Sequence, residues 1–480
     1  MEDGRCMMED VPRSGISLWL RRWLMGNVLR IGLHNFIITH PERSRGKSLI
    51  YCYLFVALVF ITNISTAQSI DSLVNEAVRN NPQLKSLQYK ITAAERRSES
   101  VNTMPPPSFS VEFSQVPINT LNVLNKSVSN NFSLSQMFPI GGKLNAMSEV
   151  ERQNMKVEGN NYESYKTNLI AQLKMSYYNL WLLDRKIEIQ QKQIELLNNL
   201  IRSVESVYIT NRINQADLLT LQSEIASGET QILTLQNQKS TEIYKLNKLL
   251  GRELNSKDIY AEKEIASDSL IIPQSKLEEI LTEENPSLKK MNSMIDMNKA
   301  MIDANNRELI PDLMVQGMLM RMPRGMLLTS KTDPMMIDGK GETELMYGIM
   351  ASINLPFAPW SANKFKAKEE ELYAGISSFE YEKEDMRRDM ISKLNESILK
   401  YKTALDLIKL YNEKVIPLNE KAIEAQTSAF QNNRTSVTTI IDSYRMLLMQ
   451  QMNYYMARAD SRMAIAEIEM MIGTNLITGR

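Results

Sequence analysis

Methionine is the residue in this sequence with the clearest capacity for ligand chemistry. The 480-residue chain contains 31 methionines but only two cysteines and two histidines, all four of which lie among the first 52 positions. Thioether sulfur is a soft ligand, and soft ligands select Cu(I) and its heavier congener Ag(I). The rest of the chain has no thiol nucleophile, imidazole base, disulfide or Cys/His zinc site. We therefore expect no cofactor and no enzymatic activity.

Thirteen of the methionines are concentrated between Met291 and Met350. Two segments of this region alternate between residue types with the period of two that is typical of β-strands. The methionines share one parity, opposite the face that carries Val315 in the first segment and Tyr347 in the second. The candidate soft-metal ligands are Met314, Met318, Met320, Met322, Met346 and Met350. The alternative interpretation is an adaptable lining without metal affinity.

The same alternation occurs at about 108–117, 130–138, 312–323 and 344–355, which predicts four strands. Their length and their apolar face match membrane-spanning β-barrel strands. Four strands cannot close a barrel, and open strand edges are not tolerated in lipid, so we expect several subunits to combine. Tyr347 and Trp360 belong either to an interfacial aromatic belt or to a contact between subunits.

A long helical hairpin is predicted after each pair of strands, at about 143–250 and about 360–472. No proline occurs between Pro139 and Pro273, and glycine is rare in this stretch, which favours uninterrupted helices. Apolar residues recur every seven positions, as in coiled coils, and Pro417 should interrupt the second hairpin. The proposed seams are Leu180, Ile187, Ile194 and Ile201 in the first hairpin and Met449, Met456, Met463 and Met470 in the second.

The first 67 residues have the pattern of an extension followed by a secretory signal peptide. Basic residues up to Lys47 precede an apolar run from Leu49 to Ile64, and small residues end at Ala67. The run has 16 residues and is short for a spanning helix, which needs about 20, although a membrane anchor is the alternative. The chain carries 56 basic and 56 acidic residues, a balance that argues against nucleic-acid binding.

The remainder is an internal duplication, with a first repeat at 68–272 and a second at 273–480. Asn81-Pro82 and Asn285-Pro286 open similar helices 204 residues apart. Each repeat is predicted to contain a short helix, two strands and a long helical hairpin. The fold class is therefore mainly α with a membrane β part.

These motifs together resemble the TolC family of outer-membrane efflux proteins. The resemblance rests on the paired "NPxL" helix starts, on "SxSQxFPxGGK" from Ser133 to Lys143 and on "YxxxRxxxxDLLxLQSE" from Tyr208 to Glu224. It implies a homotrimer whose subunits share one 12-stranded barrel in the outer membrane, continued by an α-helical tunnel through the periplasm. It also implies two partners, a periplasmic adaptor protein and an inner-membrane pump of the RND type.

The expected function is therefore a passive exit duct, with Cu(I) or Ag(I) as one class of cargo. The alternatives are a multidrug or other small-molecule channel without metal selectivity and, more remotely, a secreted structural coiled coil. Polar and charged residues near the two hairpin turns are candidates for adaptor contacts or for the tunnel aperture, with ordinary solvated turns as the alternative. They are Asn211, Arg212, Asn214, Asp217, Asn433, Arg434, Ser436 and Asp442.

Overall fold

The computed structural model describes residues 69–208, 215–256, 259–265, 272–323, 328–329, 337–338, 343–432 and 434–476. The predicted signal segment lies outside these residues. None of the helices in the described ranges is long and apolar enough to cross a bilayer.

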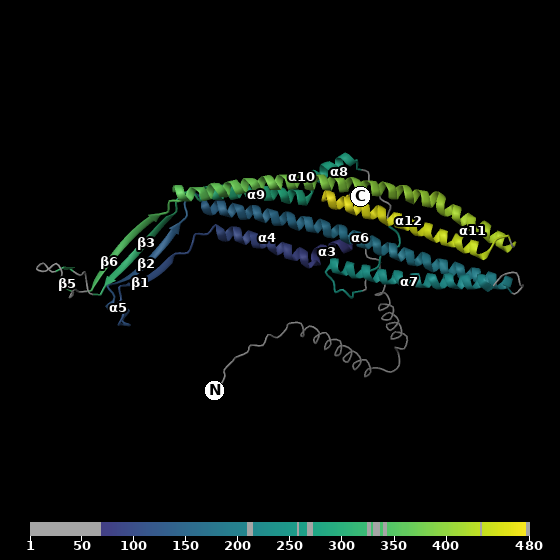
Figure 1. Ribbon diagram of the computed structural model, residues 1–480, viewed down its shortest axis with the longest axis horizontal. Helices are drawn as coiled ribbons and strands as arrows, with labels where there is room; N and C mark the ends of the chain where they lie inside the picture. Colours follow the sequence, from purple (N-terminus) through teal and green to yellow (C-terminus); the bar gives the residue numbers. More distant parts are fainter. Residues whose placement is uncertain are drawn as a thin grey trace, which may run out of the picture. The chain divides into compact units, whose positions relative to one another are not determined.

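The described elements repeat one order, shown in Figure 1. The first half contains α3 (Ile70–Asn80), α4 (Pro82–Val101), β1 (Ser108–Ser114), α5 (Val123–Lys126), β2 (Ser129–Phe138), α6 (Lys143–Tyr208) and α7 (Gln215–Leu250). The second half contains α8 (Gln274–Glu284), α9 (Pro286–Arg307), β3 (Leu313–Met322), β4 (Leu328–Thr329), β5 (Ile337–Asp338), β6 (Glu344–Ile353), α10 (Pro359–Leu410), the π-helix η1 (Tyr411–Val415), α11 (Ile416–Gln431) and α12 (Val437–Ile472). The predicted mainly α architecture with a duplicated unit is confirmed.

The two Asn-Pro pairs perform the same structural task in both halves. The Asn81 side chain accepts hydrogen bonds from Gln83 N and Leu84 N at the start of α4, and its Nδ2 donates to Leu249 O at 3.0 Å. Asn285 likewise caps the start of α9. Its Nδ2 donates to Met471 O at 2.7 Å. Each asparagine therefore joins the start of one helix to the end of a hairpin, α7 in the first half and α12 in the second.

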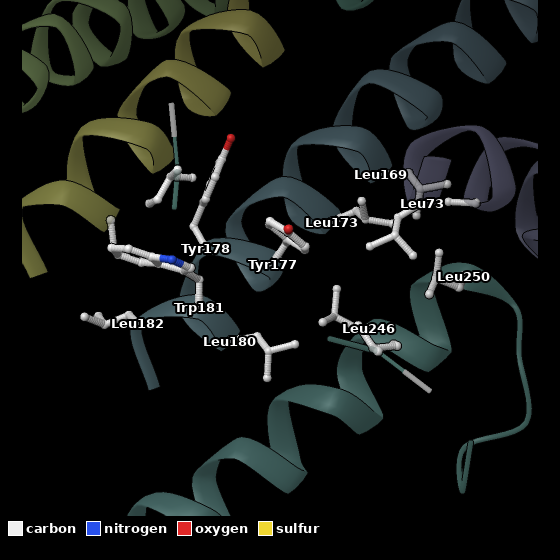
Figure 2. Packing of buried hydrophobic residues seen from close by; sticks show 14 of the residues in the cluster. Leu73, Leu169, Leu173, Tyr177, Tyr178, Leu180, Trp181, Leu182, Leu246 and Leu250 are labelled. Atoms are coloured by element: carbon white, nitrogen blue, oxygen red, sulfur yellow. The ribbon is translucent and has the colours of Figure 1, made fainter. Parts of the chain in front are cut away.

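Each half also has its own apolar core beside its Asn-Pro pair. Figure 2 shows the first core, where Leu73 of α3 and Leu246 of α7 pack with Tyr177 and Trp181 of α6. Its members include Leu73, Ala77, Leu84, Leu169, Leu173, Tyr177, Leu180, Trp181, Leu246 and Leu250. The second core contains Leu277, Leu281, Leu288, Leu394, Ile398, Ile468, Met471 and Ile472, from α8, α9, α10 and α12. Burial of these side chains supplies the main attraction between helices within each half.

The buried seam between α6 and α7 differs from the predicted one. Ile187, Ile194 and Ile201 are only partly buried, whereas Gln190 is 5% exposed. A Cβ on Gly228 would lie 2.9 Å from Gln190 Nε2, so α7 approaches α6 closely only because position 228 is glycine. The fully buried line in α6 continues through Gln193, Leu197, Leu200 and Val204, and in α7 it includes Leu221, Gly228 and Leu235.

In the second hairpin, the predicted methionine seam is not fully buried, whereas the predicted interruption near Pro417 is present. Met449 and Met456 are 53% and 39% exposed, so the predicted methionine seam of α12 is wrong for these residues within a protomer. The α-helical pattern stops at Leu410 and resumes at Ile416, after the π-helical turn η1. Pro417 cannot donate a backbone hydrogen bond, which accounts for an interruption just before it.

An ion pair holds the sheet against the long helices. Gly141 and Gly142 follow β2 with φ of +73° and +74°, and this left-handed bend leads directly into α6. Lys143 Nζ at the start of α6 lies 2.7 Å from Asp312 Oδ1, immediately before β3, and its side chain is 4% exposed. Asn354, just after β6, donates from Nδ2 to Asp312 Oδ2 at 3.0 Å. These three residues thus join three connections between strands and helices, with the Lys143 side chain buried among them.

We predict that Asn285→Ala lowers the free energy of unfolding by roughly 1–3 kcal/mol, because it removes a helix cap and leaves the Met471 carbonyl without its donor. Chemical denaturation of the purified protein in detergent measures this change. Asn237→Ala is the control, because Asn237 is an exposed residue within α7. Equal stability of the two variants would contradict the role given to Asn285.

Candidate functional site

The four long strands form one antiparallel sheet with the order β1-β2-β3-β6. Every one of them is continuous with a helical element at the same end of the sheet, which we call the helix end; the opposite end is the loop end. In the described part of the chain, β1 and β6 each have a strand neighbour on one side only. The sheet therefore has two unpaired edges.

The strand register separates the side chains of the sheet into two faces, because directly paired residues of antiparallel strands point the same way. The apolar face is strongly exposed, with Tyr347 at 87% and Ile349 at 80%. Its members are Phe109, Val111, Phe113, Phe132, Leu134, Phe138, Leu313, Val315, Leu319, Leu345, Tyr347, Ile349, Ala351 and Ile353. Such a continuous apolar surface is unfavourable in water and suits a lipid environment.

The opposite face, which we call the polar face, contains hydroxyl, amide and carboxylate side chains. It includes Ser108, Ser110, Glu112, Ser114, Asn131, Ser133, Ser135, Gln316 and Ser352. Ser108 and Ser135 are joined by a 2.6 Å hydrogen bond between their hydroxyls, and Ser110 and Ser133 by another of 2.6 Å. These groups suit an aqueous interior.

All six candidate methionines lie on the polar face, by the same register. Met320 is directly opposite Met346. Met318 is opposite Gly348, and its Cε lies 3.7 Å from the position that a Cβ on residue 348 would take. Met350 is 47% exposed, and the other five candidates are partly buried. The six side chains, which we call the methionine row, are therefore partly accessible on the polar face.

The register also adds a methionine that was absent from the candidate set. Met137 of β2 lies directly opposite Met314 of β3, on the polar face. The signal was present in the sequence, because Met137 shares parity with Ser133 and Ser135. Directly opposed side chains have Cβ atoms about 4.5–5.5 Å apart, so the Met137–Met314 and Met320–Met346 pairs each bring two thioethers together.

Other metal chemistry is not evident in the described ranges. No group of three or more His, Cys, Asp and Glu residues is arranged there to hold an ion. Among the described residues, the methionine row is therefore the candidate metal site.

The hairpin turns are only partly described. Asn211, Arg212, Asn214 and Asn433 lie outside the described residues. The other four turn candidates are Asp217, Arg434, Ser436 and Asp442. Asp217 is in the first turn of α7, Arg434 and Asp442 are exposed, and Ser436 caps the start of α12 by accepting a hydrogen bond from Thr439 N at 3.4 Å.

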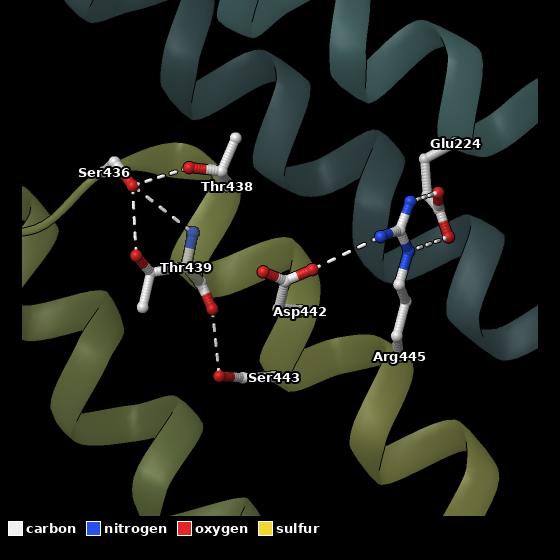
Figure 3. A network of polar contacts seen from close by, with 7 residues as sticks. All are labelled: Glu224, Ser436, Thr438, Thr439, Asp442, Ser443 and Arg445. Atoms are coloured by element: carbon white, nitrogen blue, oxygen red, sulfur yellow. Dashed lines mark hydrogen bonds and ion pairs between the residues drawn. The ribbon is translucent and has the colours of Figure 1, made fainter.

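An ion pair near these turns links the two hairpins (Figure 3). Arg445 of α12 donates from Nε to Glu224 Oε1 of α7 at 2.9 Å and pairs with the second carboxylate oxygen as well. Its Nη1 also lies 3.2 Å from Asp442 Oδ1. The hydrogen bond that Arg445 donates to the Glu224 carboxylate raises the pKa of Arg445 above its ordinary value. No motif in the sequence indicated this pair, because its members are 221 positions apart.

Both the sequence and the fold of this chain are similar to those of known proteins. Residues 73–252 match the outer membrane efflux protein family. No match was found among curated proteins. Solved structures with the same fold include the outer-membrane channel OprN (14% identity, TM-score 0.68), CusC (16%, 0.66) and the Campylobacter jejuni CmeC outer membrane channel (13%, 0.67).

The structural similarity covers most of both chains. The matches include 85% of this chain and 90% of OprN, 85% and 93% for CusC, and 84% and 85% for CmeC. The exposed apolar sheet and the long helices therefore belong to one shared fold. Residues 73–252 match the outer membrane efflux protein family, and the chain has the fold of the outer-membrane channels to which it is similar.

Proposed function

We propose that this protein is the passive exit duct of a tripartite efflux system. The observation that carries the proposal is the sheet, which has an apolar face, a polar face and two unpaired edges. Unpaired backbone groups are not tolerated in lipid. Three copies would join β1 of one subunit to β6 of the next and close a 12-stranded barrel around the polar faces.

The proposal assigns the energy of transport to the partners. A homotrimer of this kind offers a water-filled path and no catalytic step, so an inner-membrane pump of the RND type drives export. A periplasmic adaptor protein connects the pump to the hairpin ends. The residues that we propose for adaptor contacts or for the aperture at these ends are Asn211, Arg212, Asn214, Asp217, Asn433, Arg434, Ser436 and Asp442.

For the cargo, we propose Cu(I) or Ag(I), guided by the methionine row of the polar face. Met137–Met314 and Met320–Met346 supply paired thioethers, and Met318, Met322 and Met350 extend the row along β3 and β6. Sulfur ligands that hold a soft ion weakly and in series allow it to enter and leave again. A multidrug channel is the second candidate, because methionine also makes an adaptable apolar lining.

The barrel proposal predicts that the purified protein is a trimer in detergent and forms stable ion-conducting pores in planar bilayers. Native mass spectrometry measures the first property and single-channel recording the second. A protein recovered only from the soluble fraction, without pores, would instead indicate the secreted coiled-coil alternative.

The cargo proposal predicts that changing Met314, Met318, Met320 and Met322 together to leucine lowers copper and silver tolerance several-fold in a complemented deletion strain. Leucine preserves apolar volume but removes the sulfur ligand. Met104→Leu with Met147→Leu is the matched control, because both methionines are exposed outside the sheet. Unchanged metal tolerance in the fourfold variant would remove these residues from the mechanism and favour the multidrug candidate.

The hairpin link predicts that Arg445→Ala increases single-channel conductance, because α7 and α12 lose their bidentate contact near the aperture. Arg445→Lys keeps the charge without the planar two-point contact, so we expect an intermediate conductance. Arg388→Ala on α10 is the control, since Arg388 forms an exposed pair with Glu384 within its own helix. Equal conductance of the Arg445→Ala channel and the unaltered channel would exclude this pair from the aperture.

A further inference from the structure

The loop between β1 and β2, residues 115–128, is unusually apolar for a connection at the end of a sheet. Its single charged residue is Lys126. Ile118 and Leu121 are almost fully exposed, at 106% and 99%, and Leu124 is 51% exposed. The apolar residues of the loop are Val116, Pro117, Ile118, Leu121, Val123, Leu124 and Val128. An exposed apolar cluster of this kind requires a partner, because water is a poor one.

The position of this loop follows from two polar residues at the loop end of the apolar face. Asn130 of β2 pairs with Arg321 of β3 at the loop end, and the register places both on the apolar face. Asn130 is completely buried, and its Nδ2 donates to Leu124 O at 2.8 Å. Arg321 Nη1 donates to the same carbonyl at 3.0 Å. The loop therefore folds over the apolar face of the sheet and not over the polar face.

The loop is also ordered by its own hydrogen bonds. Asn122 Oδ1 accepts from Asn125 N at 3.3 Å, which begins the short helix α5. Thr120 N donates to Pro117 O at 3.3 Å, and Val128 N donates to Ser114 O at 3.0 Å. Backbone groups that are paired within the loop can approach lipid at lower cost than unpaired ones. The hydrogen-bonded backbone of the loop thus holds these apolar side chains in a defined arrangement.

We propose that residues 115–128 form an interfacial lipid anchor that inserts Ile118, Leu121 and Leu124 into the headgroup–acyl boundary of the outer leaflet. This inference rests on the proposed function, in which the apolar face of the sheet meets lipid. Apolar residues bind such a boundary by burying area, while a nearby cation contacts lipid phosphate. Lys126 is exposed in the same loop and supplies that cation.

The two ends of the sheet support this assignment. Phe357 and Trp360, just beyond the helix end of β6, are 57% and 87% exposed, and exposed aromatic residues are typical of a membrane interface. A ten-residue strand spans about 33 Å, and tilting by about 40° reduces this to roughly 25 Å, the height of a barrel's apolar band. The loop thus lies at one boundary of that band and Trp360 at the other.

A second copy of this chain is a less suitable occupant. In the proposed barrel, neighbouring subunits meet at the edge strands β1 and β6. The loop is anchored by Asn130 and Arg321, which lie on the two central strands β2 and β3. Lipid covers the apolar face of central strands, and the loop is continuous with that face.

Site-specific fluorescence in vesicles tests the inference. Cys6→Ser and Cys52→Ser leave the full chain without another thiol, so Leu121→Cys can carry an environment-sensitive NBD label. In phosphatidylcholine–phosphatidylglycerol vesicles, we expect a nitroxide near the top of the acyl chain to quench this label more than a nitroxide near its end. We also expect little quenching by aqueous iodide. Adding Arg321→Gln should reduce the lipid quenching at least twofold.

Labels at two control positions allow the anchor proposal and the barrel proposal to be tested separately. A label at Tyr347→Cys reports on the apolar face, and a label at Asn119→Cys reports on an exposed polar position beside the anchor. Lipid quenching at Tyr347 with iodide quenching at Leu121 would overturn the anchor and leave the barrel intact. Protection of Leu121 from both quenchers would also overturn the anchor, since it indicates burial against a neighbouring copy. Iodide quenching at both Leu121 and Tyr347 would overturn the barrel together with the anchor.

Discussion

The hydrogen-bonding groups along the free edges of β1 and β6 are the constraint on which the rest of this structure depends. A sheet whose exposed face is apolar belongs in lipid, and lipid offers no partner for an unpaired amide or carbonyl. The described part of the chain does not satisfy these groups by itself, because the four long strands end at those two edges. Joining copies edge to edge satisfies the backbone and at the same time encloses the polar faces around water.

The arrangement of the strands requires a firm connection to the helices, and a group of polar side chains that includes the buried Lys143 makes that connection. The contacts among Lys143, Asp312 and Asn354 join the start of α6 to β3 and β6. Farther along the helices, Asn81 and Asn285 tie each helix start to a hairpin end. Removing one partner from such a site leaves a buried group unsatisfied, which costs more than losing an exposed contact. The sheet and the helices are therefore fixed to each other by few, specific contacts.

Sequence patterns predicted the features that depend on periodicity and failed where distant segments meet. The period of two was sufficient to place six methionines on one face, because the face of a side chain follows from its position along its own strand. Which residues lie directly opposite each other depends on how two strands are paired, so the Met137–Met314 pair was found only from the fold. Gln190 is a polar residue outside the predicted apolar seam, yet it is buried because Gly228 lets α7 approach. Glu224 and Arg445 meet only because two hairpins lie beside each other.

The π-helical turn at Tyr411–Val415 has no counterpart in the first half, where α6 runs without interruption from Lys143 to Tyr208. An additional residue in a helical turn rotates everything that follows it relative to what precedes it. The two hairpins of one chain are therefore similar in sequence pattern but not equivalent in the surfaces that they present. In a ring of three chains, six hairpins would alternate between two kinds, and the ring would have threefold but not sixfold symmetry. Any protein that docks around it in six copies must accept two different binding environments.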